Sequence, residues 1–184
     1  SLIGVPGLFK CWKKGNVGII NALGTGVADD KAVYSYVNKM IVYYLGEQPI
    51  LNQVETFLCE DKVHRQHVIE NISKLVVKPA NASGGYGIMI GPKAPKKERE
   101  EVIKKIKKNP RDFVAQPLEI LSTTPTISEN GIEPRHLDLR PFVLNGKSTY
   151  VTTGGLTRVA LRKGSTIVNS SQGGGSKDTM VVDT

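Results

Sequence analysis

Leu75-Val76-Val77-Lys78-Pro79 leads into Ser83-Gly84-Gly85-Tyr86-Gly87, and these two runs carry the strongest structural signal in the chain. The apolar run 75–77 predicts a buried strand. Because Pro79 disfavours the helical conformation for the residue before it, we expect Lys78 to be held extended at the end of that strand. The glycines let the following loop bring backbone N–H groups close to an anion. The pattern therefore predicts a site for a nucleotide polyphosphate, although an ordinary β-hairpin loop with a surface lysine fits it as well.

The elements predicted around this loop favour the nucleotide interpretation. In chain order they are a strand at 75–78, the glycine loop at 80–87, a strand at 88–90, a charged helix at about 95–108 and a strand at 113–116. Prolines 92 and 110 delimit the helix. The last strand runs straight into Gln116-Pro117-Leu118, where backbone amides are placed to pair with the edge of an adenine.

The flanking sequence predicts helices before this unit and strands after it. Before it we expect a strand at 17–20, a helix capped by Asp29 or Asp30 that runs to about Leu45, a strand at 56–58 and a helix at about 61–72. After residue 120, Asn145-Gly146 indicates a hairpin. A second hairpin is expected from 156–161 and 166–168, turning at Lys163-Gly164, and residues 170–176 are expected to form a flexible loop. The predicted fold class is therefore α+β.

The positive charge of the chain is local. The 184 residues carry a net charge of +8, and residues 93–108 contribute eight basic and three acidic side chains, or +5 of that total. Such a run is most often the solvated face of a helix, and the alternative is a patch for nucleic acid or for an acidic partner. No aromatic residue lies between Lys93 and Lys108 to stack on bases, which argues against the nucleic-acid alternative.

The composition excludes several classes of protein. The chain is 39% hydrophobic, enough for one large domain or two small lobes, and no apolar run approaches the roughly 20 residues of a membrane span. Residues 1–6 lack the features of a signal peptide. Cys11 and Cys59 have no metal-ligand spacing and predict reduced thiols. These features predict a cytoplasmic protein without a membrane partner.

Other motifs are weaker. Residues 173–179 superficially resemble a P-loop but lack its Gly-Lys-Ser/Thr triplet, and Gly24-x-Gly26 lacks the third glycine of a dinucleotide fingerprint. His64 and His67 have no third ligand nearby and predict surface helix residues rather than a metal site.

Two charged residues on one predicted strand have two open interpretations. Asp138 and Arg140 are two positions apart and so face the same way. They either serve a site or pair with each other on a solvated face. The same ambiguity applies to Arg158.

A series of motifs along nearly the whole chain resembles the circularly permuted ATP-grasp family, type 2, which is similar in turn to glutathionylspermidine synthetase. The motifs are Gly24-Thr25-Gly26-Val27-Ala28-Asp29-Asp30-Lys31-Ala32, Val77-Lys78-Pro79, Ser83-Gly84-Gly85-Tyr86-Gly87, Ala115-Gln116-Pro117, Asp138-Leu139-Arg140-Pro141-Phe142, Gly154-Gly155-Leu156-Thr157-Arg158 and the run from Val168 to Thr179.

The resemblance implies an ATP site between two α+β lobes. It divides the chain into 1–73, a part of the nucleotide-binding core with two helices, 74–120, the lobe that carries the glycine-loop lid, and 121–184, a β-rich lobe that completes the cleft. The implied nucleotide contacts are Lys31, Lys78, the lid residues Gly84, Gly85, Tyr86 and Gly87, and the adenine hinge Gln116, Pro117 and Leu118. Arg140 and Arg158 are the implied catalytic residues.

The implied activity is ATP-dependent ligation of a carboxylate to an amine, giving a peptide-like amide through an acylphosphate. Family members are often encoded beside alpha-E and transglutaminase-like proteins, which are therefore possible partners. The alternatives are a non-catalytic ATP-grasp scaffold and the nucleic-acid or acidic-partner module on 93–108. The sequence identifies neither the carboxylate, nor the amine, nor the oligomeric state.

One departure from the family pattern concerns Mg²⁺. An ATP-grasp site holds the metal with an acidic pair and usually an asparagine, and Asn169 has no acidic residue two positions before it. We therefore expect the metal ligands outside this segment. On this interpretation the chain is the C-terminal part of a longer protein and is catalytically inactive by itself.

Overall fold

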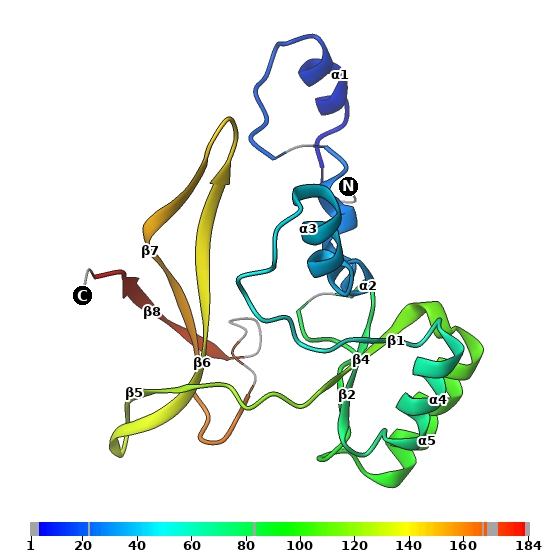
Figure 1. The fold of residues 1–184 in the computed structure, drawn as a ribbon. Coiled ribbons are helices and arrows are strands. Elements are labelled where there is room, and N and C mark those ends of the chain that lie inside the picture. Colours follow the sequence, from blue (N-terminus) through cyan, green and yellow to red (C-terminus); the bar gives the residue numbers. More distant parts are fainter. Residues whose placement is uncertain (1–3, 22, 83, 167, 169–172, 183–184) are drawn as a thin grey trace. The chain divides into compact units, whose positions relative to one another are not determined.

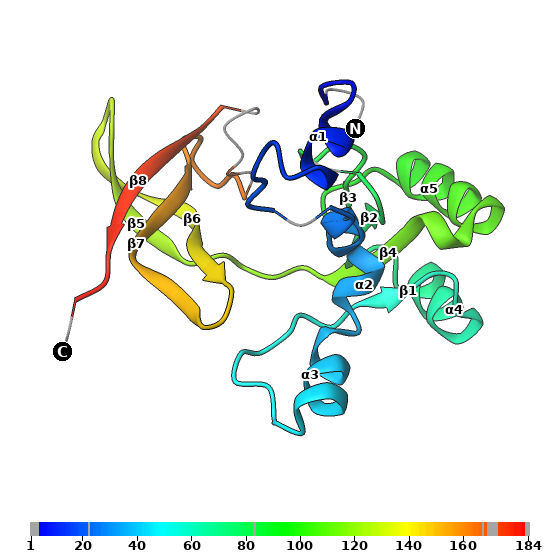
Figure 2. The same cartoon turned by 90° about the horizontal axis from the view of Figure 1, so that it is seen from above.

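The computed structural model describes residues 4–21, 23–82, 84–166, 168 and 173–182 (Figure 1, Figure 2). The chain has an α+β fold and divides into two compact units, residues 1–53 and residues 54–184. Ser83 of the glycine loop, Asn169 and residues 170–172 of the predicted flexible loop lie outside the described residues. The division predicted at 73/74 and 120/121 stays a prediction.

Unit 1 is helical over its described residues. It contains α1 (Leu8–Lys13), the 3-10 helix η1 (Thr25–Asp29), α2 (Lys31–Tyr34) and α3 (Val37–Leu45). The predicted cap is confirmed, because the Asp30 carboxylate accepts a hydrogen bond of 2.8 Å from the backbone N–H of Ala32. The single helix predicted up to Leu45 is wrong. The Ser35 hydroxyl donates to the carbonyl of Ala32 at 2.8 Å, a local bond that competes with the helical ladder where α2 ends.

The strand predicted at 17–20 is also wrong. These four residues are all described and form no strand, and no other described segment of unit 1 offers a strand edge to pair with. The prediction followed an apolar run, but a strand needs a partner for its backbone groups.

Unit 2 begins with the arrangement that the sequence predicted. Its elements are β1 (Phe57–Leu58), α4 (Lys62–Glu70), β2 (Leu75–Pro79), β3 (Met89–Ile90), α5 (Lys96–Lys108), the 3-10 helix η2 (Pro110–Asp112) and β4 (Phe113–Pro117). The strands form an antiparallel sheet in the order β1-β4-β2-β3. The predicted strand–loop–strand–helix–strand order is confirmed.

The two helices α4 and α5 lie side by side on one face of this sheet (Figure 1, Figure 2). The core between helices and sheet contains Cys59, Val68, Ile72, Leu75, Val77, Met89, Ile106 and Ala115. Ile106 and Val68 are completely buried, and burial of such a side chain contributes about 1.5–3 kcal/mol. Because side chains alternate along a strand, the residues between these core positions face the other side of the sheet.

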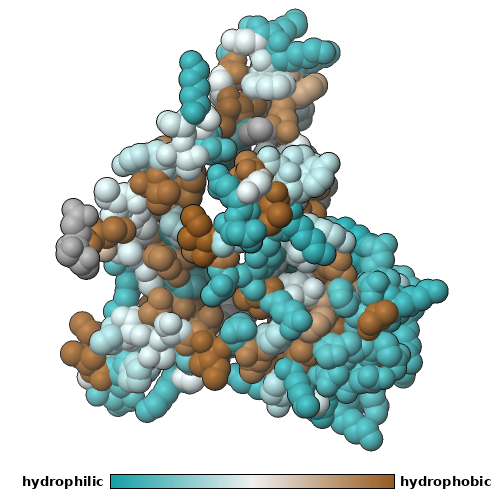
Figure 3. Space-filling model, in the orientation of Figure 1, coloured by the Kyte–Doolittle hydropathy of each residue, from teal (hydrophilic) through white to brown (hydrophobic). Residues whose placement is uncertain are grey.

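The basic run forms the outer face of α5. Ile106 is buried and Val102 and Ile103 pack against the core, while the lysines are exposed. Figure 3 shows hydrophilic side chains over α4 and α5. The expectation of a solvated helix face is confirmed.

The rest of unit 2 is a second antiparallel sheet. It consists of β5 (Thr123–Ser128), β6 (Gly131–Asn145), β7 (Thr149–Ala160) and β8 (Gly174–Met180), in that order. The hairpin predicted at Asn145-Gly146 joins β6 to β7. No helix within the described ranges has the length and apolar character needed to cross a membrane.

The second predicted hairpin is wrong. β7 pairs with β6 and β8 instead, residues 166 and 168 lie outside any strand, and residue 167 is not among the described residues. Residues 174–176, predicted as loop, are strand. A glycine run typically indicates a loop, but here glycine lets the strands approach. A Cβ at Gly175 would lie 3.0 Å from Leu161 Cδ2, and one at Gly154 would lie 3.0 Å from the carbonyl of Thr179.

Candidate functional site

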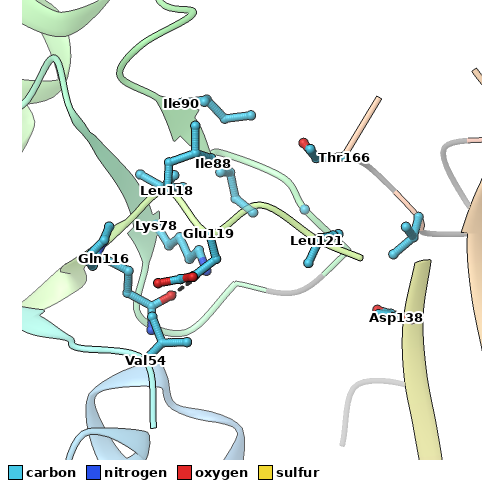
Figure 4. Close-up of a pocket in the computed structure, with 14 residues that line it drawn as sticks. Val54, Lys78, Ile88, Ile90, Gln116, Leu118, Glu119, Leu121, Asp138 and Thr166 are labelled. Carbon is cyan, nitrogen blue, oxygen red and sulfur yellow. Dashed lines mark hydrogen bonds between the residues drawn. The ribbon is translucent and has the colours of Figure 1, made fainter. Parts of the chain in front are cut away.

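A cavity of about 470 Å³ lies within unit 2 (Figure 4). This volume is within the range of about 300–1,000 Å³ usual for small-molecule sites. The lining residues are Val54, Val76, Lys78, Gly85, Ile88, Ile90, Gln116, Pro117, Leu118, Glu119, Leu121, Asp138, Thr166 and Val168.

Strand register explains why these residues meet. Val76 lies opposite Gln116 of β4 and opposite Ile90 of β3, so the three side chains share one face. Their neighbours Leu75, Val77, Met89 and Ala115 belong to the core under the helices. The first sheet therefore has one face for packing and one face for the cavity.

Lys78 is held in place on the cavity face. It is half-buried, and its Nζ donates a hydrogen bond of 2.6 Å to Oε1 of Gln116 (Figure 4). Gln116 Nε2 in turn donates to Oγ1 of Thr56 at 2.8 Å. Hydrogen bonds from a charged donor are stronger than neutral ones, so the ammonium has a preferred position.

The walls of the cavity are mainly apolar. Ile88, Ile90, Leu118 and Leu121 surround the region near Lys78 (Figure 4). Polar groups are few, namely the side chains of Lys78, Gln116, Glu119, Asp138 and Thr166. Apolar walls with a few polar groups suit a flat heterocycle that carries a charged substituent.

The glycine loop adjoins this cavity. Gly84, Gly85 and Gly87 have φ values of 70°, 79° and 73°, which favour glycine over any residue with a side chain. Gly85 lines the cavity, whereas Tyr86 is 69% exposed. A Cβ at Gly87 would lie 2.9 Å from Pro79 Cγ, so the loop passes close to the end of β2.

The second sheet brings both predicted arginines to one aspartate. Asp138 lies opposite Arg158 in the pairing of β6 with β7. Arg140 Nη2 donates to Asp138 Oδ2 at 2.7 Å, and its Nε donates to both carboxylate oxygens at 3.2 Å. The hydrogen bonds that Arg140 donates to the Asp138 carboxylate raise the pKa of Arg140 above its ordinary value. The predicted pairing of Asp138 with Arg140 is confirmed, and a role of these residues in a site stays a prediction.

Comparison with known proteins identifies the family. The model of the circularly permuted ATP-grasp type 2 family matches residues 1–160. The chain belongs to this family.

Three relatives show how this segment recurs in longer proteins. The chain is 54% identical to an uncharacterized protein of Synechocystis sp. and 52% identical to an uncharacterized protein of Mycobacterium tuberculosis, in each case over 99% of the chain. It is 49% identical over 97% of its length to a Frankia casuarinae protein named "Putative glutamate--cysteine ligase 2-2". It spans 38%, 33% and 21% of the lengths of these three relatives, respectively.

The described residues differ in how well they suit the two implied ligands, ATP and Mg²⁺. The cavity fits a nucleotide in volume, in its apolar walls and in its half-buried ammonium. A magnesium cage is a different matter, since the described ranges contain no group of three or more His, Cys, Asp or Glu placed to hold a metal ion. Asp138, which lines the cavity, is already paired with Arg140.

An ion cluster built on the buried Arg135 holds the segment that leads to the cavity. Arg135 is 5% exposed, and its Nη2 lies 2.7 Å from Glu133 Oε2 while its Nε donates to the carbonyl of Leu161 at 3.0 Å. Hydrogen bonds from Arg135, then Ser128 and Lys163, lower the pKa of Glu133 to about 2. The chain then continues from Leu161 to the cavity residues Thr166 and Val168.

The remaining predicted site residues have different outcomes. Five of the predicted nucleotide contacts line one cavity, and their contact with a nucleotide stays a prediction: Lys78, Gly85, Gln116, Pro117 and Leu118. Lys31 begins α2 of unit 1, so its contact with a nucleotide stays a prediction.

Sequence reasoning missed Thr56 and Glu119. Glu119 directly follows the predicted hinge and lines the cavity, so its proximity in sequence was an available signal. Thr56 lies 60 residues from Gln116, and only the pairing of β1 with β4 brings them together.

Proposed function

We propose that this chain is the ATP-binding part of an ATP-dependent ligase that joins a carboxylate to an amine. The observation that carries the proposal is the Lys78 ammonium, held 2.6 Å from Gln116 Oε1 in a largely apolar cavity. An ammonium of fixed position suits the phosphates, and the apolar walls suit the base. Membership of the family and the ligase names of the Frankia relatives support the same class of reaction.

The residues of the cavity take distinct roles in this proposal. Lys78 binds a phosphate oxygen, and the backbone of Gln116 to Leu118 faces the edge of the adenine. The glycine loop, with Gly84, Gly85, Tyr86 and Gly87, covers the phosphates. Lys31 belongs to unit 1 and does not line this cavity, and its role as a second nucleotide ammonium is proposed on the family resemblance alone. Glu119, at the edge of the cavity, offers carboxylate oxygens to the hydroxyls of a ribose.

The proposed reaction has two steps, phosphoryl transfer and amide formation. A substrate carboxylate oxygen attacks the γ-phosphorus of ATP, so that an acylphosphate forms and ADP leaves. The amine then attacks the acyl carbon, the C–O bond to phosphate breaks, and the amide forms with loss of one proton. Arg140 and Arg158 stabilise the negative charge that moves between these groups, and Asp138 orients Arg140.

Mg²⁺ would neutralise charge on the phosphates in such a site, and we assign its ligands to parts of the protein beyond the described residues. We therefore assign nucleotide binding to this chain and amide formation to the whole protein, acting in the cytoplasm. The carboxylate and amine partners, and any alpha-E or transglutaminase-like partner, belong to that larger assembly.

A thermal-shift experiment tests the proposal. ATP and ADP at millimolar concentration should raise the melting temperature of the chain, because a ligand that binds only the folded state stabilises it. Lys78→Ala should abolish the shift, and Lys74→Ala, at an exposed position before β2, should retain it. A shift that survives in Lys78→Ala contradicts the assignment.

A further inference from the structure

We propose that Thr56 is a positioning residue that fixes the Lys78 ammonium through the side-chain amide of Gln116. The inference rests on the proposed function, since it concerns how the nucleotide site is kept in shape. Thr56 lies outside every motif that identified the site, and it acts without contacting the phosphates itself.

The strands place Thr56 beside Gln116. β1 pairs antiparallel with β4, with Phe57 opposite Ala115 and Leu58 opposite Val114. Continuing this register by one residue puts Thr56 opposite Gln116, on the cavity face of the sheet. The 2.8 Å bond from Gln116 Nε2 to Thr56 Oγ1 is therefore a contact between directly facing residues.

Donor and acceptor chemistry fixes the direction of the hydrogen bonds that link Val54, Thr56, Gln116 and Lys78. The Thr56 hydroxyl has one proton, which it donates to the carbonyl of Val54 at 3.0 Å. Its oxygen can then only accept from Gln116, so Gln116 must present its NH₂ group to Thr56. The amide oxygen consequently faces Lys78, which is a donor only.

Lys78 and Thr56 therefore require the same orientation of the Gln116 amide, and loss of either hydrogen bond weakens the preference for that orientation. Gln116 and Thr56 are half-buried. If the Gln116 NH₂ group loses its acceptor, hydrogen bonds to water therefore replace the lost bond only in part. Without the hydroxyl at position 56, Gln116 turns toward another acceptor and its oxygen leaves Lys78. The ammonium then loses this hydrogen bond and its preferred position changes, so phosphate binding carries the cost of restoring that position.

Three variants of the 184-residue chain test this inference. Thr56→Val removes the hydroxyl at nearly constant volume, and Thr56→Ser restores it. Thr126→Val is the matched control, because the Thr126 hydroxyl, like that of Thr56, donates to the carbonyl two residues before it, at 3.2 Å. Calorimetric titration with ADP and with adenosine gives the affinity of each variant with and without phosphates.

We expect Thr56→Val to weaken ADP binding about three- to tenfold, the usual value of one hydrogen bond. Adenosine binding should change less than twofold, because the effect passes through the ammonium. Thr56→Ser and Thr126→Val should bind ADP within twofold of the unaltered chain. Equal loss of ADP and adenosine affinity, or unchanged ADP affinity in Thr56→Val, overturns the inference, as does an equal loss in Thr126→Val.

A second measurement separates this inference from the proposed function. In the nucleotide-free chain, Thr56→Val and Gln116→Met should lower the urea midpoint by less in combination than the sum of their single effects, because they remove the same bond. Additive effects overturn the inference. Failure of the unaltered chain to bind ADP overturns the proposed function, and the urea measurement still decides whether Thr56 and Gln116 are coupled.

Discussion

Asp138 of β6 lies directly opposite Arg158 of β7 and shares its own strand face with Arg140. Asp138, which lines the cavity, is therefore hydrogen-bonded to Arg140 on its own strand and faces the backbone position of Arg158 on the next strand. The side chain of Arg140 is 44% exposed, and ion pairs at such exposure contribute about 0–1 kcal/mol. The arrangement orients a charge more than it stabilises the fold.

Replacement of this carboxylate tests that view. Asp138→Asn should lower the free energy of unfolding by less than about 1 kcal/mol, measured by urea denaturation. Asp178→Asn, at an exposed position of β8, is the matched control. A loss above about 2 kcal/mol for Asp138→Asn alone would show that the pair is structural.

The path of the glycine loop can be tested by comparing an alanine variant inside the loop, at Gly87, with one outside it, at Gly164. Gly87 and Gly164 both have φ of +73°, but a Cβ at Gly87 would lie 2.9 Å from Pro79 Cγ, while a Cβ at Gly164 meets open space. Gly164→Ala should therefore cost only the backbone strain, about 1–2 kcal/mol. Gly87→Ala should cost more, as measured by urea denaturation. Equal losses would mean that the loop does not pass close to β2.

The Glu133 cluster predicts acid sensitivity. The pKa of Glu133 is lowered to about 2 from 4.5 in the folded chain, so the unfolded chain binds the proton more readily. The stabilisation is therefore present above about pH 4.5 and is lost as the pH falls toward 2. Glu133→Gln should be less stable at pH 7 and should show a weaker decline below pH 4.5. An unchanged pH profile of the urea midpoint would contradict this role.

The two cysteines should differ in reactivity. Burial raises the pKa of Cys59 to about 11, so its thiolate is scarce at pH 8, while Cys11 is exposed. A thiol reagent at pH 8 should modify Cys11 rapidly and Cys59 only after denaturation. Mass spectrometry of the labelled peptides distinguishes the two. Rapid native labelling of Cys59 would show that the core under α4 opens readily.

Much of the first sheet could be predicted from the sequence, because its signals are local. Pro79 and the apolar run before it mark β2, and the helix α5 is delimited by prolines. The residues of the hinge and Gly85 of the lid were also named correctly as neighbours of Lys78, because strand order brings them to one cavity.

The errors concern features that depend on partners distant in sequence. The glycines of β8 indicate a loop unless the close approach of β7 is known. The role of Thr56 follows only from register across 60 residues. The break between α2 and α3 is a different case, because the bond from Ser35 to Ala32 is local and also fits a continuous helix.

Calorimetric titration of the chain with ATP tests the central claim most directly. Loss of a charged hydrogen-bond donor costs about 1.5–3 kcal/mol, so Lys78→Met should weaken ATP binding about tenfold or more. Lys74→Met should bind ATP within twofold of the unaltered chain. Absence of heat with the unaltered chain at millimolar ATP, or equal affinity in Lys78→Met, would contradict the account.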